Sequence, residues 1–394
     1  MNFEERILRR QRTDGDVHLV RDEDALNPLV HPAEPVGRGP VLERLLDAVA
    51  PVFEDDLPTD TVLSGPAGSG KSAVVTALVG HLSRLLSSNG RAIYTTTRAG
   101  TTAPSFVFHY VDARTASSAF GLYYAALDGL TDEQPPRGGV RTDDLRDRLD
   151  AWLDEHDRRV LLVVDHVGEP ETYPASVVRE RFDALSGPVA TLCVGREGPA
   201  ADAPVQHVPV PAYDRHAVED ILTARAVEGL SPRAFTHDQL VRIATWAEGN
   251  AHDAVCALFC AVDAALEAGG ERLTDAHVDA GIAAVPAGGI PLGRVLALTD
   301  ASAVVLDRVV DLDDDQRTSV SATATAIAAD PSVALSPGTV TRVLYELAES
   351  GVLDRVTVAA RDAGRGRPPS RLDPRFSTLA YRHLREVGPS RQRD

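Results

Sequence analysis

The feature that most constrains this chain is a glycine-rich turn at residues 65–72, which read GPAGSGKS. The segment fits the pattern G-x-x-x-x-G-K-S, follows the apolar run TVLS and precedes the helical pattern AVVTALVGHL. This strand, turn and helix are the context that a phosphate-binding loop requires. The glycines at 65, 68 and 70 let backbone N–H groups wrap closely around phosphates at the positive end of a helix. The turn predicts a nucleotide site.

The use of lysine supports this interpretation over a chance glycine-rich turn. Of the 40 basic residues in the 394-residue chain, 39 are arginine, and the only lysine is Lys71, inside the turn. We expect Lys71 to reach the β- and γ-phosphates of ATP or ADP and Ser72 to ligate Mg²⁺. The predicted nucleotide-binding residues of the turn are Gly65, Pro66, Ala67, Gly68, Ser69, Gly70, Lys71 and Ser72.

Besides Ser72, Mg²⁺ needs a second protein ligand, and a carboxylate for this role is predicted at Asp165, which directly follows the apolar run 160–164. An Asp that merely caps a loop after a core strand is the alternative. The next residue is His166, where hydrolytic enzymes with such loops usually carry Glu to orient the attacking water. His166 or nearby Glu169 is a conceivable base, but no catalytic residue is assigned. We therefore expect ATP to be hydrolysed slowly or not at all.

The hydropathy pattern divides the chain into four parts. After a charged N-terminal segment (1–30), nearly continuous apolar strands alternate with amphipathic helices over 31–208, which predicts an α/β domain with a parallel sheet covered on both faces. Four consecutive helix patterns over 209–290 predict a helical lid domain. Residues 291–394 contain three helix patterns followed by a short β-like run, an order that resembles a winged helix.

Charge is unevenly distributed along the chain. The net charge of −18 argues against an average affinity for polyanions. Residues 355–394, however, contain ten arginines against four acidic side chains. A basic patch on an acidic protein is the footprint of a DNA-binding face. The alternative is a tail that solubilises the chain or pairs with its acidic surface.

A helix just before this basic region has the features of a DNA-reading helix. Ser336 can cap it, and Thr339, Thr341 and Arg342 lie near its start, off the apolar stripe. In a helix-turn-helix, residues at this position meet base edges, and a hairpin wing contacts phosphate or the minor groove. The candidate wing residues are Arg361, Arg365 and Arg367. An ordinary capped helix and a solvated loop remain the alternative.

The overall composition indicates the cellular environment in which the protein works. A large acidic excess with almost no lysine is typical of cytoplasmic proteins of halophiles that accumulate KCl. The N-terminus lacks an apolar signal region, and no run reaches the length of a membrane helix. We therefore expect a cytoplasmic protein. The three cysteines, Cys193, Cys256 and Cys260, are interpreted as core residues, not as a metal site.

The order of an α/β phosphate-loop domain, a helical lid and a C-terminal winged helix resembles the plan of AAA+ replication initiators. The likeness to the archaeal origin-recognition family, the Orc/Cdc-type initiators, extends over residues 27–385. It is carried by VGRGPVLERLLDAVAPVF, FHYVDARTASSAFGLYYAAL, PAYDRHAVEDILTARAVEGL and WAEGNAHDAVCALFCAVDAA, besides the phosphate loop. Of these segments only the phosphate loop is specific alone.

The resemblance implies roles for particular residues. Arg38 matches the family's Gly-Arg pair before the phosphate loop, although Gly39 replaces the acidic residue that commonly follows. Tyr213 and Arg225 match the start of the lid. Two sensing positions depart: Arg196 stands where a polar Asn is expected, and His252 stands where the lid normally directs an Arg at the γ-phosphate. With His166, these departures indicate a divergent, haloarchaeal-like paralogue that binds ATP with doubtful turnover.

The resemblance also implies partners. A family member binds double-stranded DNA at origin-like sites, helps load the replicative helicase and self-associates on DNA. Two other functions remain open: a nucleotide-gated transcription regulator with the same winged helix, and a signalling ATPase of the STAND type whose winged helix contacts protein. The arginine-rich wing argues against the second.

Overall fold

The structure is a computed structural model of the chain. It describes residues 18–89, 106–131, 133–156, 158–298, 300–313, 315–357 and 370–387. The wing arginines predicted above, Arg361, Arg365 and Arg367, lie outside the described residues.

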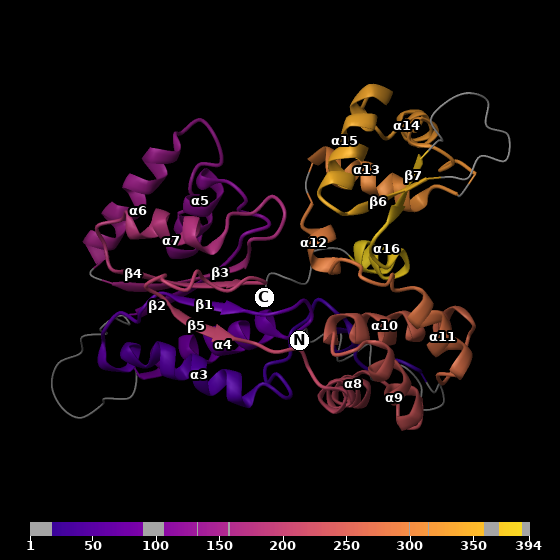
Figure 1. Cartoon of the computed structure of the whole chain (residues 1–394), viewed down its shortest axis with the longest axis horizontal. Coiled ribbons are helices and arrows are strands. Elements are labelled where there is room, and N and C mark those ends of the chain that lie inside the picture. The colour runs from indigo at the N-terminus through magenta and orange to yellow at the C-terminus, as the bar shows by residue number, and fades with distance from the viewer. Residues whose placement is uncertain are drawn as a thin grey trace.

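A five-stranded parallel sheet organises the N-terminal half (Figure 1). Its strands are β1 (Thr61–Ser64), β2 (Phe106–Asp112), β3 (Arg159–Val167), β4 (Val189–Gly195) and β5 (Gln206–Pro209), in the spatial order β2-β3-β4-β1-β5. The central strands are buried on both faces, which explains their continuous apolar sequences. The edge strand β5 was not predicted, because only Val208 of its four residues is buried.

Helices cover both faces of this sheet, as predicted. The helices of one face are α3 (Gly39–Val49), followed by the short 3₁₀ helix η1 (Ala50–Glu54), and α4 (Lys71–Asn89). Those of the other are α5 (Ala119–Leu130), α6 (Thr142–His156) and α7 (Ala175–Asp183) (Figure 1). Each face has its own hydrophobic core. The prediction of an α/β domain with a covered parallel sheet is confirmed.

The four predicted lid helices are α8 (Arg215–Gly229), α9 (His237–Trp246), α10 (Ala251–Glu267) and α11 (Asp275–Ala283). Side-chain caps mark the starts of all four: Asp214 caps α8, Thr236 forms a capping box with Gln239, Asn250 caps α10, and Thr274 caps α11. The central helix α10 is buried over most of its length and carries two of the three cysteines. All three cysteines are buried, as expected.

The N-terminal segment packs on these lid helices. Helix α2 (Glu23–Leu26) contacts α8, and Val20 pairs with Leu230. Arg225 of α8 donates hydrogen bonds to the carbonyls of residues 25, 27 and 30. The residue that matched the family at the start of the lid therefore anchors the segment leading into the α/β domain.

The C-terminal part has the order of a winged helix. It contains α12 (Leu292–Leu296), α13 (Asp300–Asp311), α14 (Val320–Ala328), α15 (Pro337–Glu349), an antiparallel hairpin of β6 (Leu353–Thr357) and β7 (Ser370–Pro374), and α16 (Thr378–Val387). Helix α16 was not among the predicted elements. This part shares a continuous apolar core with the lid, and α16 packs on α10.

A partly exposed ionic cluster joins the lid to helix α16. The Nδ1 atom of His383 on α16 lies 2.9 Å from Asp263 Oδ1 on α10, and its Nε2 lies 3.0 Å from Glu23 Oε1 on α2. These carboxylates raise the pKa of His383 to about 9. A protonated His383 on α16 therefore bonds to both α10 and α2.

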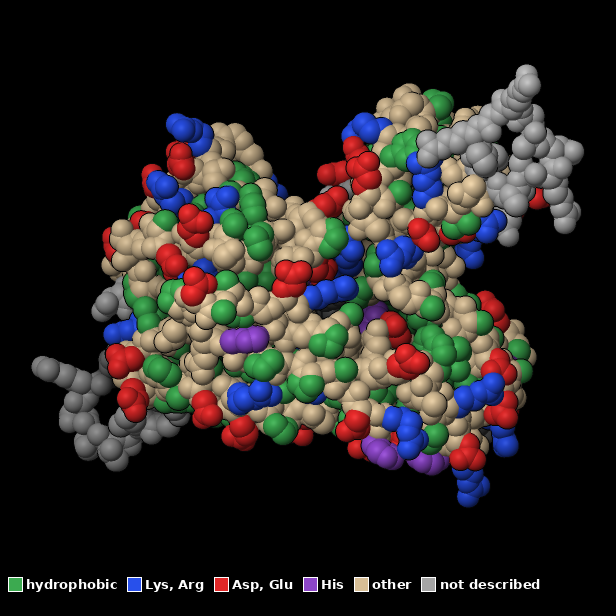
Figure 2. All heavy atoms as spheres, in the orientation of Figure 1, with side chains coloured by type: hydrophobic (Ala, Val, Ile, Leu, Met, Phe, Trp, Pro, Cys, Tyr) green, Lys and Arg blue, Asp and Glu red, His purple; other side chains and the backbone are tan. Residues whose placement is uncertain are grey.

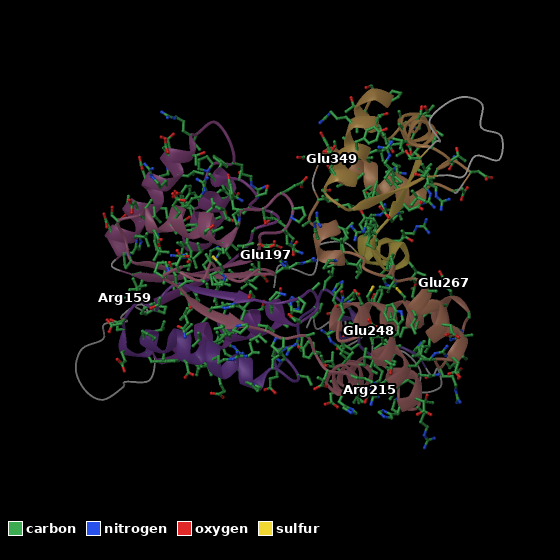
Figure 3. All side chains as sticks on the ribbon, viewed as in Figure 1. Arg159, Glu197, Arg215, Glu248, Glu267 and Glu349 are labelled. Carbon is green, nitrogen blue, oxygen red and sulfur yellow. The ribbon has the colours of Figure 1, made fainter. Side chains whose placement is uncertain are left out.

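The surface carries interspersed acidic and basic side chains on the face shown in Figure 2. Figure 3 labels Arg159 at the start of β3 and Glu197 just past β4, so the carboxyl ends of the central strands point toward the lid and winged helix. Within the described residues, no helix combines the length and apolarity needed to cross a bilayer.

Candidate functional site: a nucleotide cavity between the sheet and the lid

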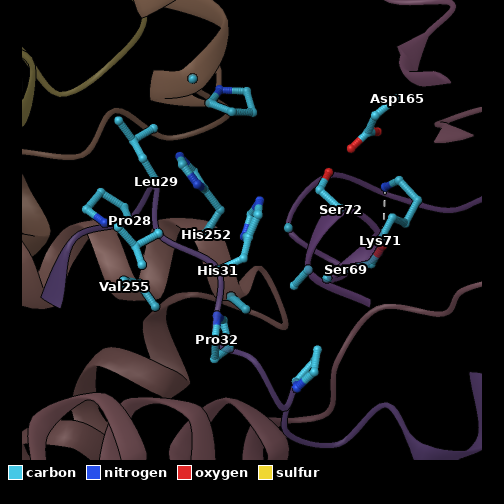
Figure 4. A pocket seen from close by; sticks show the side chains of 18 of the residues that line it. Pro28, Leu29, His31, Pro32, Ser69, Lys71, Ser72, Asp165, His252 and Val255 are labelled. Atoms are coloured by element: carbon cyan, nitrogen blue, oxygen red, sulfur yellow. Dashed lines mark hydrogen bonds between the residues drawn. The ribbon is translucent and has the colours of Figure 1, made fainter. Parts of the chain in front are cut away.

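A cavity of about 870 Å³ lies at the carboxyl ends of β1, β3 and β4 (Figure 4). Its walls come from the phosphate loop, the end of β4, the lid helices α8 and α10, the irregular segment 28–36, and helix α12. Ligand crevices in parallel α/β sheets lie at this edge, where loops leave the strands. The cavity thus collects most of the site residues predicted from the sequence.

The phosphate loop is closed around its own lysine. Ala67 to Ser72 line the cavity, whereas the carbonyls of Gly65 and Pro66 accept hydrogen bonds from Lys71 Nζ at 2.8 and 2.7 Å. Burial lowers the pKa of Lys71 to about 8. Neutral carbonyls are weak partners for an ammonium, so phosphate oxygens would be better ones.

Two glycines of the loop leave room for the lid as well as for phosphate. Gly68 and Gly70 have positive φ angles of 66° and 74°. A Cβ atom on Gly68 would lie 1.8 Å from Asn250 Oδ1, and one on Gly70 would lie 2.3 Å from the Tyr213 hydroxyl. Any other residue would be strained in this backbone region and would also push the lid away.

Arg38 joins the phosphate loop to the lid. Its Nε atom donates to the carbonyl of Ser69 and its Nη2 to the carbonyl of Pro211, both at 2.9 Å. The guanidinium carbon lies 3.4 Å from the ring centroid of Tyr213, and Arg38 is only 5% exposed. The N–H of Ala251, the first residue of α10, also donates to the Gly68 carbonyl at 3.1 Å. The lid is therefore docked directly on the loop.

Asp165 is held in a fixed orientation at the end of β3. Its Oδ2 accepts a 2.9 Å hydrogen bond from the Tyr110 hydroxyl, and its Oδ1 accepts one of 2.7 Å from the backbone N–H of His166. The side chain is 2% exposed and lines the cavity together with Ser72 (Figure 4). Tyr110 was missed from the sequence because it reads as a core residue of β2.

Ser72 and Asp165 are suited to hold Mg²⁺. A hydroxyl and a carboxylate are the hard oxygen donors that this ion prefers, and the Asp165 carboxylate is already oriented by its two donors. Bound there with nucleotide, the ion would neutralise charge on the phosphates. Among the residues that the structure describes, no group of three or more His, Cys, Asp and Glu side chains could hold a metal by itself.

His166 lies between two carboxylates. Its Nδ1 is 3.2 Å from Glu169 Oε1, its Nε2 is 3.7 Å from Asp165 Oδ2, and its backbone is left-handed, with a φ angle of 64°. Burial opposes protonation, but the charge of Asp165 and the bond to Glu169 raise the pKa of His166 above its ordinary value. Both ring nitrogens of His166 therefore face carboxylate oxygens.

The two substituted sensing positions differ in their contacts. Arg196 is exposed at the end of β4 and lines the cavity. His252 also lines it, but its Nε2 accepts a 3.3 Å hydrogen bond from the backbone N–H of Leu292 in α12. Burial lowers the pKa of His252 to about 4, so the ring is neutral. Tyr213 lines the cavity beside these residues.

Further lining residues were missed in the sequence. His31 projects into the cavity from the irregular segment (Figure 4), and Arg114 lines it from the loop after β2. Arg114 is held by a bidentate ion pair with Asp112, whose shortest N···O distance is 2.6 Å. An Asp-x-Arg pair after a predicted strand was the available signal for Arg114; His31 had none.

The predicted DNA-reading residues lie at the start of α15. The side chain of Ser336 caps the helix by accepting from the N–H of Thr339 at 3.2 Å. Thr341 donates to the Pro337 carbonyl at 2.8 Å, while Arg342 is exposed and paired with Glu346 at 2.5 Å. The arginine is thus paired with a carboxylate of its own helix, a contact that was not predicted from the sequence.

Comparisons with known proteins agree with this geometry. The family model described as "AAA ATPase domain" matches residues 34–194. A relative named ORC1-type DNA replication protein 1, from Sulfurisphaera tokodaii, is 22% identical over 66% of this chain and 66% of its own length. ORC1-type DNA replication protein 9, from Halobacterium salinarum, is 25% identical over 65% of this chain and 69% of its own.

Solved structures show the same fold across nearly the whole chain. The Aeropyrum pernix Orc1 protein in complex with DNA is 20% identical, with a TM-score of 0.63 over 94% of this chain and 97% of that one. Cdc6p from Pyrobaculum aerophilum is 17% identical, with a TM-score of 0.54 over 92% and 96%. The match to the first curated relative spans about two thirds of its length.

A phosphate loop after β1, an oriented aspartate at the end of β3 and a helical lid docked on the loop together define the fold of an AAA+ ATPase domain. The three-part architecture with a C-terminal winged helix narrows the class further. The chain carries an AAA ATPase domain, is similar to ORC1-type DNA replication proteins, and has the fold of the archaeal Orc1 and Cdc6 structures.

Proposed function

We propose that this protein is an ATP-binding DNA-replication initiator that recognises origin DNA and helps load the replicative helicase. The observation that carries the proposal is the cavity itself, which the phosphate loop, the lid and the first helix of the winged helix line together. The relatives named ORC1-type DNA replication proteins and the Orc1 structure solved with DNA support it.

The nucleotide part of the proposal rests on the contacts of the loop. Gly65 to Ser72 bind ATP or ADP. Lys71 then gives up its hydrogen bonds to the loop carbonyls and donates to phosphate oxygens instead, and Ser72 and Asp165 hold Mg²⁺. Hydrolysis is slow or lost, because His166 stands at the usual glutamate position and is bonded to Glu169. Nucleotide then acts as a bound switch.

The DNA part of the proposal rests on α15 and the hairpin after it. Thr339, Thr341 and Arg342 read base edges in the major groove, and Arg361, Arg365 and Arg367 contact the DNA backbone. In a halophile's cytoplasm, concentrated KCl weakens phosphate contacts, so groove contacts matter more. We also propose that several copies of the protein associate on one origin. The protein is then a divergent paralogue of the initiators.

The test is recovery and sequencing of genomic fragments bound by the purified protein in concentrated KCl, with and without ATP. An initiator enriches a few repeat-flanked loci beside replication genes, and enrichment falls without ATP. Enrichment at scattered promoters instead identifies a transcription regulator, a reading that the missing glutamate at position 166 favours. No enrichment at all supports a STAND-type signalling ATPase.

A matched variant separates the nucleotide from the DNA contribution. Lys71→Ala removes the only ammonium of the loop and leaves α15 unchanged. Its ATP affinity is lost, and its genomic enrichment falls to the level of the wild type without ATP. Retained ATP affinity in Lys71→Ala would refute the assignment of the site.

A further inference from the structure

The first helix of the winged helix lies over the nucleotide cavity. The cavity lining includes Gly293 and Leu296 of α12. It also includes Pro291 and Ala297, which directly flank the helix. The winged-helix domain, which carries α15, thus forms one wall of the cavity, and the phosphate loop and the lid form other walls. Whatever occupies the cavity lies next to α12.

His252 connects the cavity to α12. Figure 4 shows its ring across the cavity from Lys71 and Ser72, beside His31. Its Nε2 accepts the N–H of Leu292, the first residue of α12, and the first N–H groups of a helix have no partner within the helix. Because Nε2 accepts, the neutral ring carries its proton on Nδ1 and can donate there.

A neutral imidazole in this state can bond on both sides at once. A phosphate oxygen or a water of its shell that accepts from Nδ1 polarises the ring and makes Nε2 a better acceptor. The bond to Leu292 is then strengthened, not broken. An arginine at position 252 has only donors and would repel the same N–H group.

Two further contacts continue from α12. Arg294, two residues after Leu292, donates through Nη2 to the carbonyl of Ser350, the C-terminal cap of α15. On the other side, a Cβ atom on Gly293 would lie 3.0 Å from Arg114 Nη1, whose guanidinium is held by Asp112. Helix α12 is therefore enclosed between the sheet domain and the recognition helix.

We propose that His252, α12 and Arg294 couple occupancy of the nucleotide cavity to the position of α15, so that bound ATP orders the recognition helix for DNA. This inference rests on the proposed function and adds its route of communication. It also gives His252 a role that the arginine usual at this position does not have: the residue acts on α12 as a positioning residue.

Hydrogen–deuterium exchange of the full chain in KCl, with and without ATP, tests the route. In the wild type, ATP slows exchange of the amides of residues 290–297 and of the end of α15 by about fivefold, the factor of one added net hydrogen bond. In His252→Ala, which binds ATP more weakly, neither segment responds even at an ATP concentration that a direct titration shows to saturate the site. In Arg294→Gln, α12 still responds and the end of α15 does not.

Val255→Ala is the matched control. Val255 lies one turn further along α10 and lines the same cavity, and its aliphatic side chain cannot form a hydrogen bond to α12. Its truncation weakens ATP binding and leaves the response of α12 intact at saturating ATP. The affinity for a fluorescein-labelled duplex of mixed sequence gives the second measurement: ATP raises it in the wild type and in Val255→Ala, but not in His252→Ala.

The outcomes are separable. If His252→Ala keeps the ATP response of α12, or if the wild type binds ATP in a direct titration without any change at α12, the coupling is overturned while the nucleotide site stands. If the wild type binds neither ATP nor the duplex, the proposed function falls together with the coupling. Coupling must also be reciprocal, so the duplex must raise ATP affinity by the same factor.

Discussion

Replacing Arg38 by alanine tests whether the lid is held on the phosphate loop by this single side chain. The variant loses two charge-assisted hydrogen bonds to the carbonyls of Ser69 and Pro211 and the contact of the guanidinium with the Tyr213 ring. Each bond contributes about 1.5 kcal/mol and the ring contact about 1 kcal/mol, so about 4 kcal/mol of interaction disappears. Because Arg38 is 5% exposed, water replaces little of it.

The expected result is a lower free energy of unfolding and weaker ATP binding. Urea titration in KCl, followed by far-UV circular dichroism, measures the first as a shift of the midpoint at constant slope. Isothermal titration with ATP measures the second; the Kd rises at least about tenfold, since 1.4 kcal/mol of lost docking already produces that factor.

Arg44→Ala is the control for this experiment. Arg44 lies on α3, the helix that Arg38 precedes, but it is exposed, and its side chain donates to the Pro40 carbonyl of its own helix. Its removal changes the free energy of unfolding by at most about 0.5 kcal/mol. If Arg38→Ala stays within about 1 kcal/mol of the wild type and keeps its ATP affinity, the docking argument is refuted.

Three other predictions follow from single contacts. Gly68→Ala strains the loop and collides with Asn250, so ATP affinity in a titration falls by more than about tenfold, and an unchanged affinity would contradict the proximity of the lid. Glu346→Gln frees Arg342 and raises the affinity for a DNA duplex at constant salt; a weaker complex would exclude this helix from the interface. His383 has a folded pKa of about 9, above its ordinary 6.5, so its stabilising contribution is complete below pH 6.5 and is lost as pH rises through 9. The difference in melting temperature between the wild type and His383→Gln should shrink between these values, and a constant difference would show that the ring is not charged.

The sequence was sufficient for the features with a strong local signal, although the edge strand β5 and helix α16 were not predicted. The phosphate loop was predicted because its glycines, its lysine and the flanking strand and helix are contiguous. The strands β1 to β4 were predicted because strands buried on both faces have continuous apolar sequences. The lid helices were predicted because burial of a helix face gives hydropathy a helical period. Asp165 was predicted because it directly follows such a strand. These signals are local, and the fold retains them.

Contacts between distant segments were decided only by the tertiary structure. Arg38 bonds to a carbonyl 173 residues away, and Tyr110 orients a carboxylate 55 residues away. His252 was expected at the nucleotide, yet its bond goes to Leu292, 40 residues further on. Nothing in the residue types specifies these pairs, because a hydrogen-bonding side chain in a sequence has many possible partners. Packing of the lid and α12 against the sheet edge brings one of these possible partners within about 3 Å of each side chain.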